Sequence, residues 1–143
     1  MATILIIEDN ETLREGIKQV VKRMEELRMV LDLAHSSEAV LDDALAIATR
    51  PVIVSHTGVR GTCDSRRNLA DRHVQGVAAT GGLVSIAYFP EAVCGTTVGD
   101  ILRAILYTVR LVGVDHVGLG SDCACAALGA SSVSRRTTDT PPS

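Results

Sequence analysis

The sequence predicts an α/β fold built on one parallel sheet of about five βα units, and three observations support this. Short β-branched runs alternate with stretches of helical periodicity over most of the 143 residues. Aromatic residues make up only 2% of the chain, so its core must consist of Val, Ile, Leu and Ala. The 12 glycines suit repeated turns between strands and helices. A partial (β/α)8 barrel and a flavodoxin-like open sheet both fit, because a complete barrel needs about 250 residues.

The first half of the chain shows two strand–helix units. In order, the predicted elements are a strand at Thr3–Ile7, a helix from Thr12 to about Leu27, a strand at Met29–Leu33 and a helix from Ser37 to about Thr49. Both strands are short apolar runs, and both helices place their apolar residues on one face. Ser37 is a typical N-cap residue, and Pro51 ends the second helix.

The second half continues the same alternation. Its predicted elements are a strand at Val52–Val54, a polar loop at Thr57–Asn68, a helix from Asp71 to Gly81-Gly82, a strand at Leu83–Ala87, a helix from Thr97 or Asp100 to about Leu111 and a strand at Val117–Leu119. The pattern ends after Asp122. Residues 126–143 are rich in Ser, Thr and Ala and end in Pro-Pro-Ser, which predicts a disordered tail after a single domain at 1–125.

Composition excludes several functional classes. With 14 basic and 17 acidic residues the net charge is −3, which favours neither nucleic acid nor an anionic membrane as a partner. No apolar run reaches the roughly 18 residues of a membrane span. The start of the chain lacks the basic segment of a signal peptide. The four cysteines form no CxxC motif, so we expect reduced thiols and a cytoplasmic protein.

Chemically capable residues follow every predicted strand. They are, in strand order, Glu8 and Asp9, then His35, His56, Tyr88 and Asp122. Ligands of parallel α/β folds collect at the carboxyl ends of the strands, so these side chains should converge. Two histidines and a carboxylate suit a zinc-type site. The alternative is that both histidines merely cap helices, while His73 and His116 fit a packing role better.

Three arginines, Arg60, Arg66 and Arg67, lie in the loop after His56. Guanidinium groups near a metal suit a substrate carboxylate, because arginine donates two parallel hydrogen bonds to it. A solvated loop explains them equally well.

Residues 27–122 resemble the membrane (renal) dipeptidase family of zinc metallopeptidases. The resemblance lies in MVLDLAHSSE, RPVIVSHTGVRGTCDSRRNLAD, GGLVSIAYFPEAVCG and LVGVDHVGLGSD. It implies a (β/α)8 barrel with a two-zinc site that hydrolyses dipeptides. It further implies His35 and His56 as metal ligands, Arg67 as the holder of the substrate carboxylate and Asp122 as the catalytic carboxylate that handles the proton of a metal-bound water. Tyr88 falls where the family lines its substrate pocket.

Residues 1–26 resemble the opening of a response-regulator receiver domain, in which an acidic pair like Glu8 and Asp9 binds Mg²⁺. The family's first-strand metal ligands and its bridging glutamate have no counterpart in the matched segment. We therefore expect a receiver-like unit at 1–26 joined to half a dipeptidase barrel at 27–125. Such a chain is an incomplete or chimeric dipeptidase with weak or no activity, and it could form a homodimer that completes the sheet. The alternative function is a non-catalytic receiver-like signalling or interaction domain.

Overall fold

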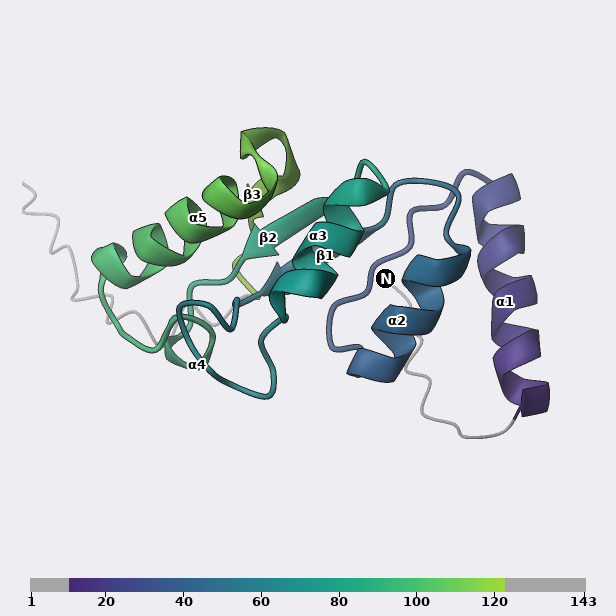
Figure 1. Ribbon diagram of the computed structural model, residues 1–143, viewed down its shortest axis with the longest axis horizontal. Helices are drawn as coiled ribbons and strands as arrows, with labels where there is room; N and C mark the ends of the chain where they lie inside the picture. The colour runs from purple at the N-terminus through teal and green to yellow at the C-terminus, as the bar shows by residue number, and fades with distance from the viewer. Residues whose placement is uncertain (1–10, 123–143) are drawn as a thin grey trace, which may run out of the picture.

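The computed structural model describes residues 11–122 of the chain. The predicted strand at Thr3–Ile7 and the predicted tail at 126–143 lie outside the described residues. The described elements are, in order, α1 (Glu11–Glu26), α2 (Glu38–Ile47), β1 (Ile53–Thr57), α3 (Asp71–Ala79), β2 (Leu83–Ile86), α4 (Pro90–Val93), α5 (Val98–Val112), a 3-10 turn at Val114–His116 and β3 (Val117–Leu119) (Figure 1).

The three strands form a parallel sheet whose order follows the chain, β1-β2-β3. Residues 31–33 extend it beyond β1 through a single parallel bridge between Asp32 and Ile53. There the Leu33 amide donates to the Ile53 carbonyl at 2.8 Å, and the Ile53 amide donates to the Leu31 carbonyl at 2.9 Å. A flavodoxin-like order would place another strand between these two segments, so that alternative is wrong. Neighbours in chain order are the arrangement of a barrel wall.

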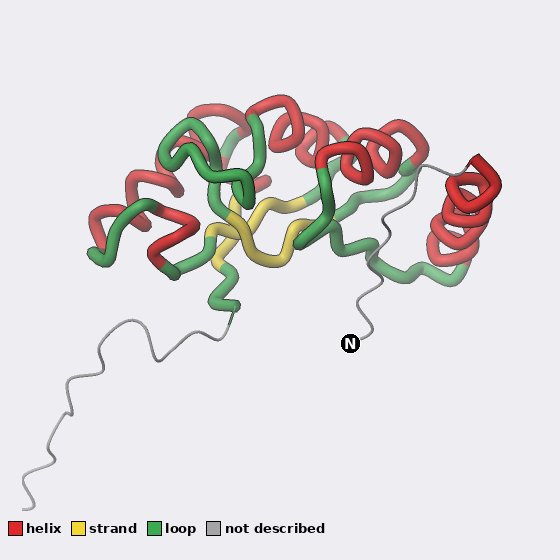
Figure 2. The backbone as a smooth tube through the Cα atoms, turned by 90° about the horizontal axis from the view of Figure 1, so that it is seen from below, coloured by secondary structure: helices red, strands yellow, loops and turns green. Residues whose placement is uncertain are grey.

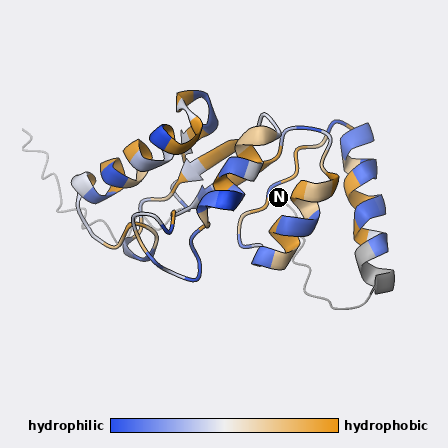
Figure 3. Ribbon diagram, viewed as in Figure 1, coloured by the Kyte–Doolittle hydropathy of each residue, from blue (hydrophilic) through white to orange (hydrophobic). Residues whose placement is uncertain are grey.

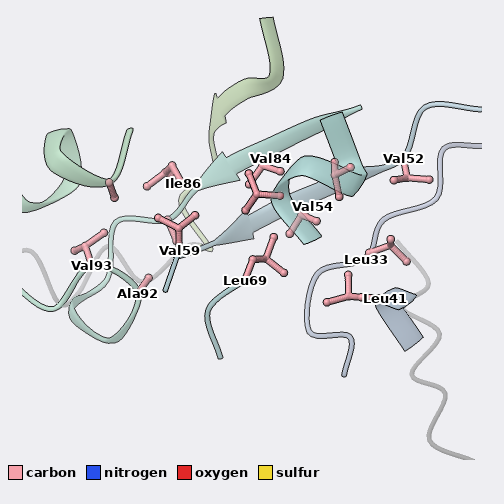
Figure 4. Close-up of a cluster of buried hydrophobic side chains, with 14 of the residues drawn as sticks. Leu33, Leu41, Val52, Val54, Val59, Leu69, Val84, Ile86, Ala92 and Val93 are labelled. Carbon is pink, nitrogen blue, oxygen red and sulfur yellow. The ribbon is translucent and has the colours of Figure 1, made fainter. Parts of the chain in front are cut away.

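All the helices that cover the sheet lie on one side of it, as Figure 2 shows. Alternate strand residues therefore point into a core formed with the helices. Val54, Val84 and Ile86 lie at its centre, each at most 1% exposed (Figure 4). This core contains few aromatic side chains, as the composition predicted: Phe89 belongs to it and Tyr107 packs against it.

The helices begin where their capping residues predict. The Ser37 hydroxyl accepts a hydrogen bond from the Val40 amide at the start of α2. At the start of α5, Thr97 and Asp100 cap each other reciprocally. Both helices turn an apolar stripe toward the core, and Figure 3 shows apolar and polar residues alternating along α5. These helices and the strand at Val117–Leu119 confirm the predicted elements.

Two predicted strands differ from the observed ones. The strand expected at Met29–Leu33 is reduced to one bridge, because the Asp32 carboxylate accepts a hydrogen bond from the Ala34 amide and bends the chain. The strand expected at Val52–Val54 instead continues to Thr57, since the Thr57 carbonyl pairs with the Ala87 amide at 2.8 Å. His56 therefore lies within β1 rather than after it.

The loop between β1 and α3 is fastened to the short helix α4, which the sequence analysis missed. Cys63 in the loop forms a disulfide with Cys94 at the end of α4, with 5.3 Å between their Cα atoms. The expectation of reduced cysteines is therefore wrong for this pair, because the fold brings together two residues 31 positions apart. Reduced cysteines therefore no longer support the expected cytoplasmic location.

Among the helices at residues 11–122, none combines the length and apolar character needed to cross a membrane.

Candidate metal centre

His35, His56 and Asp122 come together at one end of the sheet, where His35 follows the bridge at Asp32, His56 is the penultimate residue of β1 and Asp122 follows β3. One ligand atom from each residue lies within 4.8 Å of the other two. The Nε2 atoms of His35 and His56 are 2.8 Å apart, and His56 Nε2 lies 3.5 Å from Asp122 Oδ1. Two loops and the end of β1, all distant in sequence, thus place two imidazoles and one carboxylate around a common point.

The backbone around the cluster explains this convergence. His35 and Asp122 both have left-handed backbone, with φ of 63° and 45°, so the chain turns sharply at each. Before Asp122 the chain crosses directly over β1 at Gly120. A Cβ atom there would fall 1.9 Å from the Ser55 carbonyl oxygen, so only glycine fits. This close crossing brings Asp122 beside His56.

Two neighbouring side chains orient the histidines. Ser55 Oγ lies 3.1 Å from His56 Nδ1, so the hydroxyl can accept the Nδ1 proton and leave Nε2 free as a ligand. The Asp32 carboxylate accepts hydrogen bonds from the Ser55 and Ala34 amides, which links β1 to the segment before His35. Sequence reasoning missed both residues. A hydroxyl directly before a candidate ligand histidine was the available signal for Ser55.

Electrostatics favour neutral His35. Burial lowers the pKa of His35, and the positive charge of Arg67 and the neighbouring His56 lower it further. A neutral imidazole is the form that binds a metal ion. The cluster therefore presents His35 in its ligating form near neutral pH.

Of the three loop arginines, Arg67 reaches the cluster. Its Nη2 atom lies 3.3 Å from both His35 Nε2 and Asp122 Oδ2. Arg60 instead pairs with Glu38 of α2 at 2.5 Å. Arg66 lines an open cleft of about 650 Å³ together with Ser37, Glu38, Arg60 and Asp64.

The other sequence-derived candidates have mixed outcomes. Tyr88 is half-buried after β2, and within residues 11–122 it makes no hydrogen bond or ring contact to the cluster. Glu8 and Asp9 lie outside the described residues. His73 is buried against Asp42, and His116 Nδ1 lies 2.8 Å from the Gly82 carbonyl, so both have the packing role expected of them.

The comparisons with known proteins give this geometry a context. The sequence model of the membrane dipeptidase family, peptidase family M19, matches residues 6–136. The chain belongs to this family. The match covers the cluster and all three strands of the sheet. It also begins inside the segment expected to be receiver-like, and neither that start nor the chimeric interpretation gains support from the comparisons.

Curated relatives of this dipeptidase-family chain agree with the match. Dipeptidase ataJ of Aspergillus terreus is 37% identical over 98 residues, which are 65% of this chain and 24% of the relative. An uncharacterized dipeptidase of Schizosaccharomyces pombe, C965.12, is 30% identical over 109 residues, 73% of this chain and 26% of the relative. The chain therefore spans about a quarter of the length of these two relatives.

A solved structure shows the same fold. A metallopeptidase of Rhodobacter sphaeroides, crystallised with a phosphinate mimic of the dipeptide L-Ala-D-Ala, superimposes with a TM-score of 0.70 at 25% identity. The alignment covers 75% of this chain and 32% of that structure. The dipeptidase-family chain thus has an α/β fold with a parallel sheet like that of these metallopeptidases, over a part of their length.

Proposed function

We propose that the dipeptidase-family chain carries a metal-dependent site for the hydrolysis of dipeptides. The observation that carries this proposal is the convergence of His35, His56 and Asp122 within 4.8 Å. Two imidazole nitrogens and a carboxylate oxygen form a donor set that zinc accepts, and Ser55 supplies the outer contact that ligating histidines usually have. The donor set therefore fits zinc.

Each residue has a distinct proposed role. His35 and His56 hold the ion, which when bound would polarise the peptide carbonyl and make water more acidic. Asp122, one of whose carboxylate oxygens belongs to the donor set, takes the proton of the attacking water on its other oxygen and passes it to the leaving amine. Arg67 binds the carboxylate at the C-terminus of the dipeptide, and Tyr88 lines the pocket for its side chain.

The positions of Arg67 and Asp122 support this division of roles. Both flank the two histidines, and their contact at 3.3 Å places a cation directly beside the proposed base. A substrate carboxylate on Arg67 would thus hold a dipeptide with its peptide bond near the cluster. The substrate class follows from this, because a short peptide with a free carboxylate matches one arginine close to the reacting centre.

Hydrolysis of Gly-Xaa dipeptides by the zinc-loaded chain tests the proposal. We expect Asp122→Asn to lower kcat by about 100-fold, the usual loss for a proton-transferring group. We expect Arg67→Ala to lower kcat/KM by about 10- to 100-fold for a dipeptide and little for its C-terminal amide, since charged hydrogen bonds are lost only with the acid. Zinc-dependent hydrolysis that neither substitution changes would refute these roles.

A further inference from the structure

The guanidinium of Arg67 lies over the ring of Phe89, with its central carbon 5.0 Å from the ring centroid. We propose that Phe89 is a positioning residue that orients Arg67 toward a planar carboxylate ligand. This inference rests on the proposed function, because it assigns to Arg67 the role of binding the substrate carboxylate. Phe89 itself directly follows Tyr88 and was not among the residues that the sequence singled out.

The polar contacts of Arg67 do not fix its orientation by themselves. Its side chain is 44% exposed, and its two contacts, to His35 and Asp122, are both 3.3 Å long. Both come from the same atom, Nη2. Within residues 11–122, the guanidinium atoms Nη1 and Nε make no hydrogen bond, so their N–H groups remain for a ligand. A flat ring against the face of the guanidinium fixes the plane in which these N–H groups point.

Phe89 is held in place much more firmly than Arg67. Its ring is only 8% exposed and belongs to the apolar core, while its carbonyl accepts the Ala92 amide in the first turn of α4. A ring that already lies in the core costs little further ordering when the arginine settles on it. The immobile partner of this contact is therefore the ring, which acts on the mobile guanidinium.

The backbone that carries Arg67 is fixed to the same helix. Asn68, 3% exposed, donates from Nδ2 to the carbonyls of Cys63 at 2.8 Å and Ala92 at 2.9 Å. The Cys63–Cys94 disulfide joins the loop to the end of α4 a second time. The base of the Arg67 side chain and the ring beneath its tip thus belong to one rigid unit, so the direction of the guanidinium is set before any ligand arrives.

The size of the effect follows from that of a partly exposed cation–π contact. Loss of the ring should raise the KM for a dipeptide about two- to fivefold and leave kcat nearly unchanged. The KM for the matching dipeptide amide should not change, because the amide does not use the charged fork of Arg67.

The test compares Phe89→Leu, which keeps an apolar side chain, with Phe89→Tyr, which keeps the ring. Val93→Ala is the matched control, because Val93 is a buried core residue of α4, 1% exposed, that shares no hydrogen bond or ring contact with Arg67. Kinetics are measured with glycyl dipeptides and their amides. Independently, proton NMR of Arg67 measures the upfield ring-current shift of its side-chain protons.

We expect the ring-current shift in the wild type, Phe89→Tyr and Val93→Ala, and its loss in Phe89→Leu together with the rise in KM. An equal rise in KM in Val93→Ala would overturn the proposal, since the effect would then come from core packing. Arg67 protons without a ring-current shift in the wild type would overturn it too, whether or not the chain hydrolyses dipeptides. If the chain does not hydrolyse dipeptides but the ring-current shift is present, only the proposed function is refuted. Titration with glycylglycine, followed by NMR, then tests the role of Phe89. Binding that is two- to fivefold weaker in Phe89→Leu than in the wild type supports the proposal, and equal binding overturns it.

Discussion

At the scale of single residues, the cluster depends on backbone conformations that are costly for ordinary side chains. In the described part of the chain, four non-glycine residues have positive φ, and His35 and Asp122 are two of them. Such a conformation costs on the order of 1 kcal/mol or more per residue, and the surrounding structure must compensate for it. In return, the sharp turns at His35 and Asp122 direct these two side chains toward each other and toward His56.

Ser55 offers a test of how the cluster is oriented. Its hydroxyl lies 3.1 Å from His56 Nδ1 and can accept the Nδ1 proton, which would leave Nε2 free as a ligand. We expect Ser55→Ala to weaken zinc binding about tenfold, a common loss for an outer-shell partner. Competition with a chromophoric chelator measures this affinity, and Ser65→Ala in the adjoining loop serves as a control. Equal zinc affinity in the wild type and Ser55→Ala would contradict this role.

Residue types and strand-end positions were sufficient to predict His35, His56 and Asp122 as a group, and the family resemblance pointed to Arg67. Asp32 and Phe89 could not be predicted in the same way, and Ser55 carried a weaker signal, a hydroxyl next to a candidate ligand histidine. Their roles depend on which side chain lies within about 3–5 Å of another, and that follows from the twist and register of the sheet rather than from spacing along the chain.

At the scale of elements, hydrogen bonds between charged and polar side chains join α2 to α3. Asp42 of α2 accepts a hydrogen bond from Nε2 of the buried His73 at 2.8 Å. Arg72 pairs with Glu38 at 2.8 Å and with Asp42 at 3.4 Å. Because α2 begins three residues after His35, these contacts fix the segment that carries one of the proposed ligands.

The pH dependence of stability tests this junction. The hydrogen bond from His73, assisted by Arg72, lowers the pKa of Asp42 below its ordinary value of 3.8. Between the two pKa values the unfolded chain binds more protons than the folded chain, so the free energy of unfolding falls as pH decreases through that range. We expect this fall to be shallower in Asp42→Asn than in the wild type, measured by urea unfolding from pH 6 to pH 3. The exposed Asp64→Asn is the control, and identical slopes in Asp42→Asn and the wild type would contradict the assignment.

The helices could be predicted because capping residues and apolar stripes lie within each segment. Ser37 and Thr97 mark the first turns of α2 and α5, and Asp71 begins α3, as the sequence indicated. The loop between β1 and α3 could not be predicted. Its shape depends on a disulfide to a residue 31 positions away and on Asn68, and neither partner is visible in the local sequence.

At the scale of the whole molecule, the described sheet is covered on one face only. Leu83 and Ser85 alternate with the core residues of β2 and point away from the helices, and Gly118 of β3 lies against both. At the edge of the sheet, β3 pairs with β2 alone among the described strands, and Leu119 is 62% exposed. A barrel encloses such a face, whereas residues 11–122 leave it open.

Unpaired sheet edges and uncovered apolar faces favour association with another chain. We therefore keep the prediction that this chain forms a homodimer. We expect sedimentation equilibrium to give twice the mass of 15.1 kDa. Leu119→Lys should shift the chain toward the monomer by placing a charge on the edge strand, while Val98→Lys, at the 81% exposed start of α5, should not. A monomer at concentrations of about 100 μM would contradict this prediction.

The α/β class and the parallel sheet could be predicted from alternation of apolar runs, and the choice between barrel and open sheet could not. That choice depends on whether the segment around Asp32 lies directly beside β1. Both arrangements use the same strands, the same right-handed crossovers and the same apolar runs, so only the observed pairing distinguishes them.

Zinc binding by the purified chain tests the central claim most directly. Titration calorimetry with elemental analysis should give about one zinc ion per chain, because His35, His56 and Asp122 together offer ligands for one ion. Binding should be lost in His35→Ala and in His56→Ala, and it should persist in His116→Ala, whose imidazole contacts the Gly82 carbonyl instead. Two tightly bound ions per chain, or zinc binding indifferent to both His35→Ala and His56→Ala, would contradict the proposed metal centre.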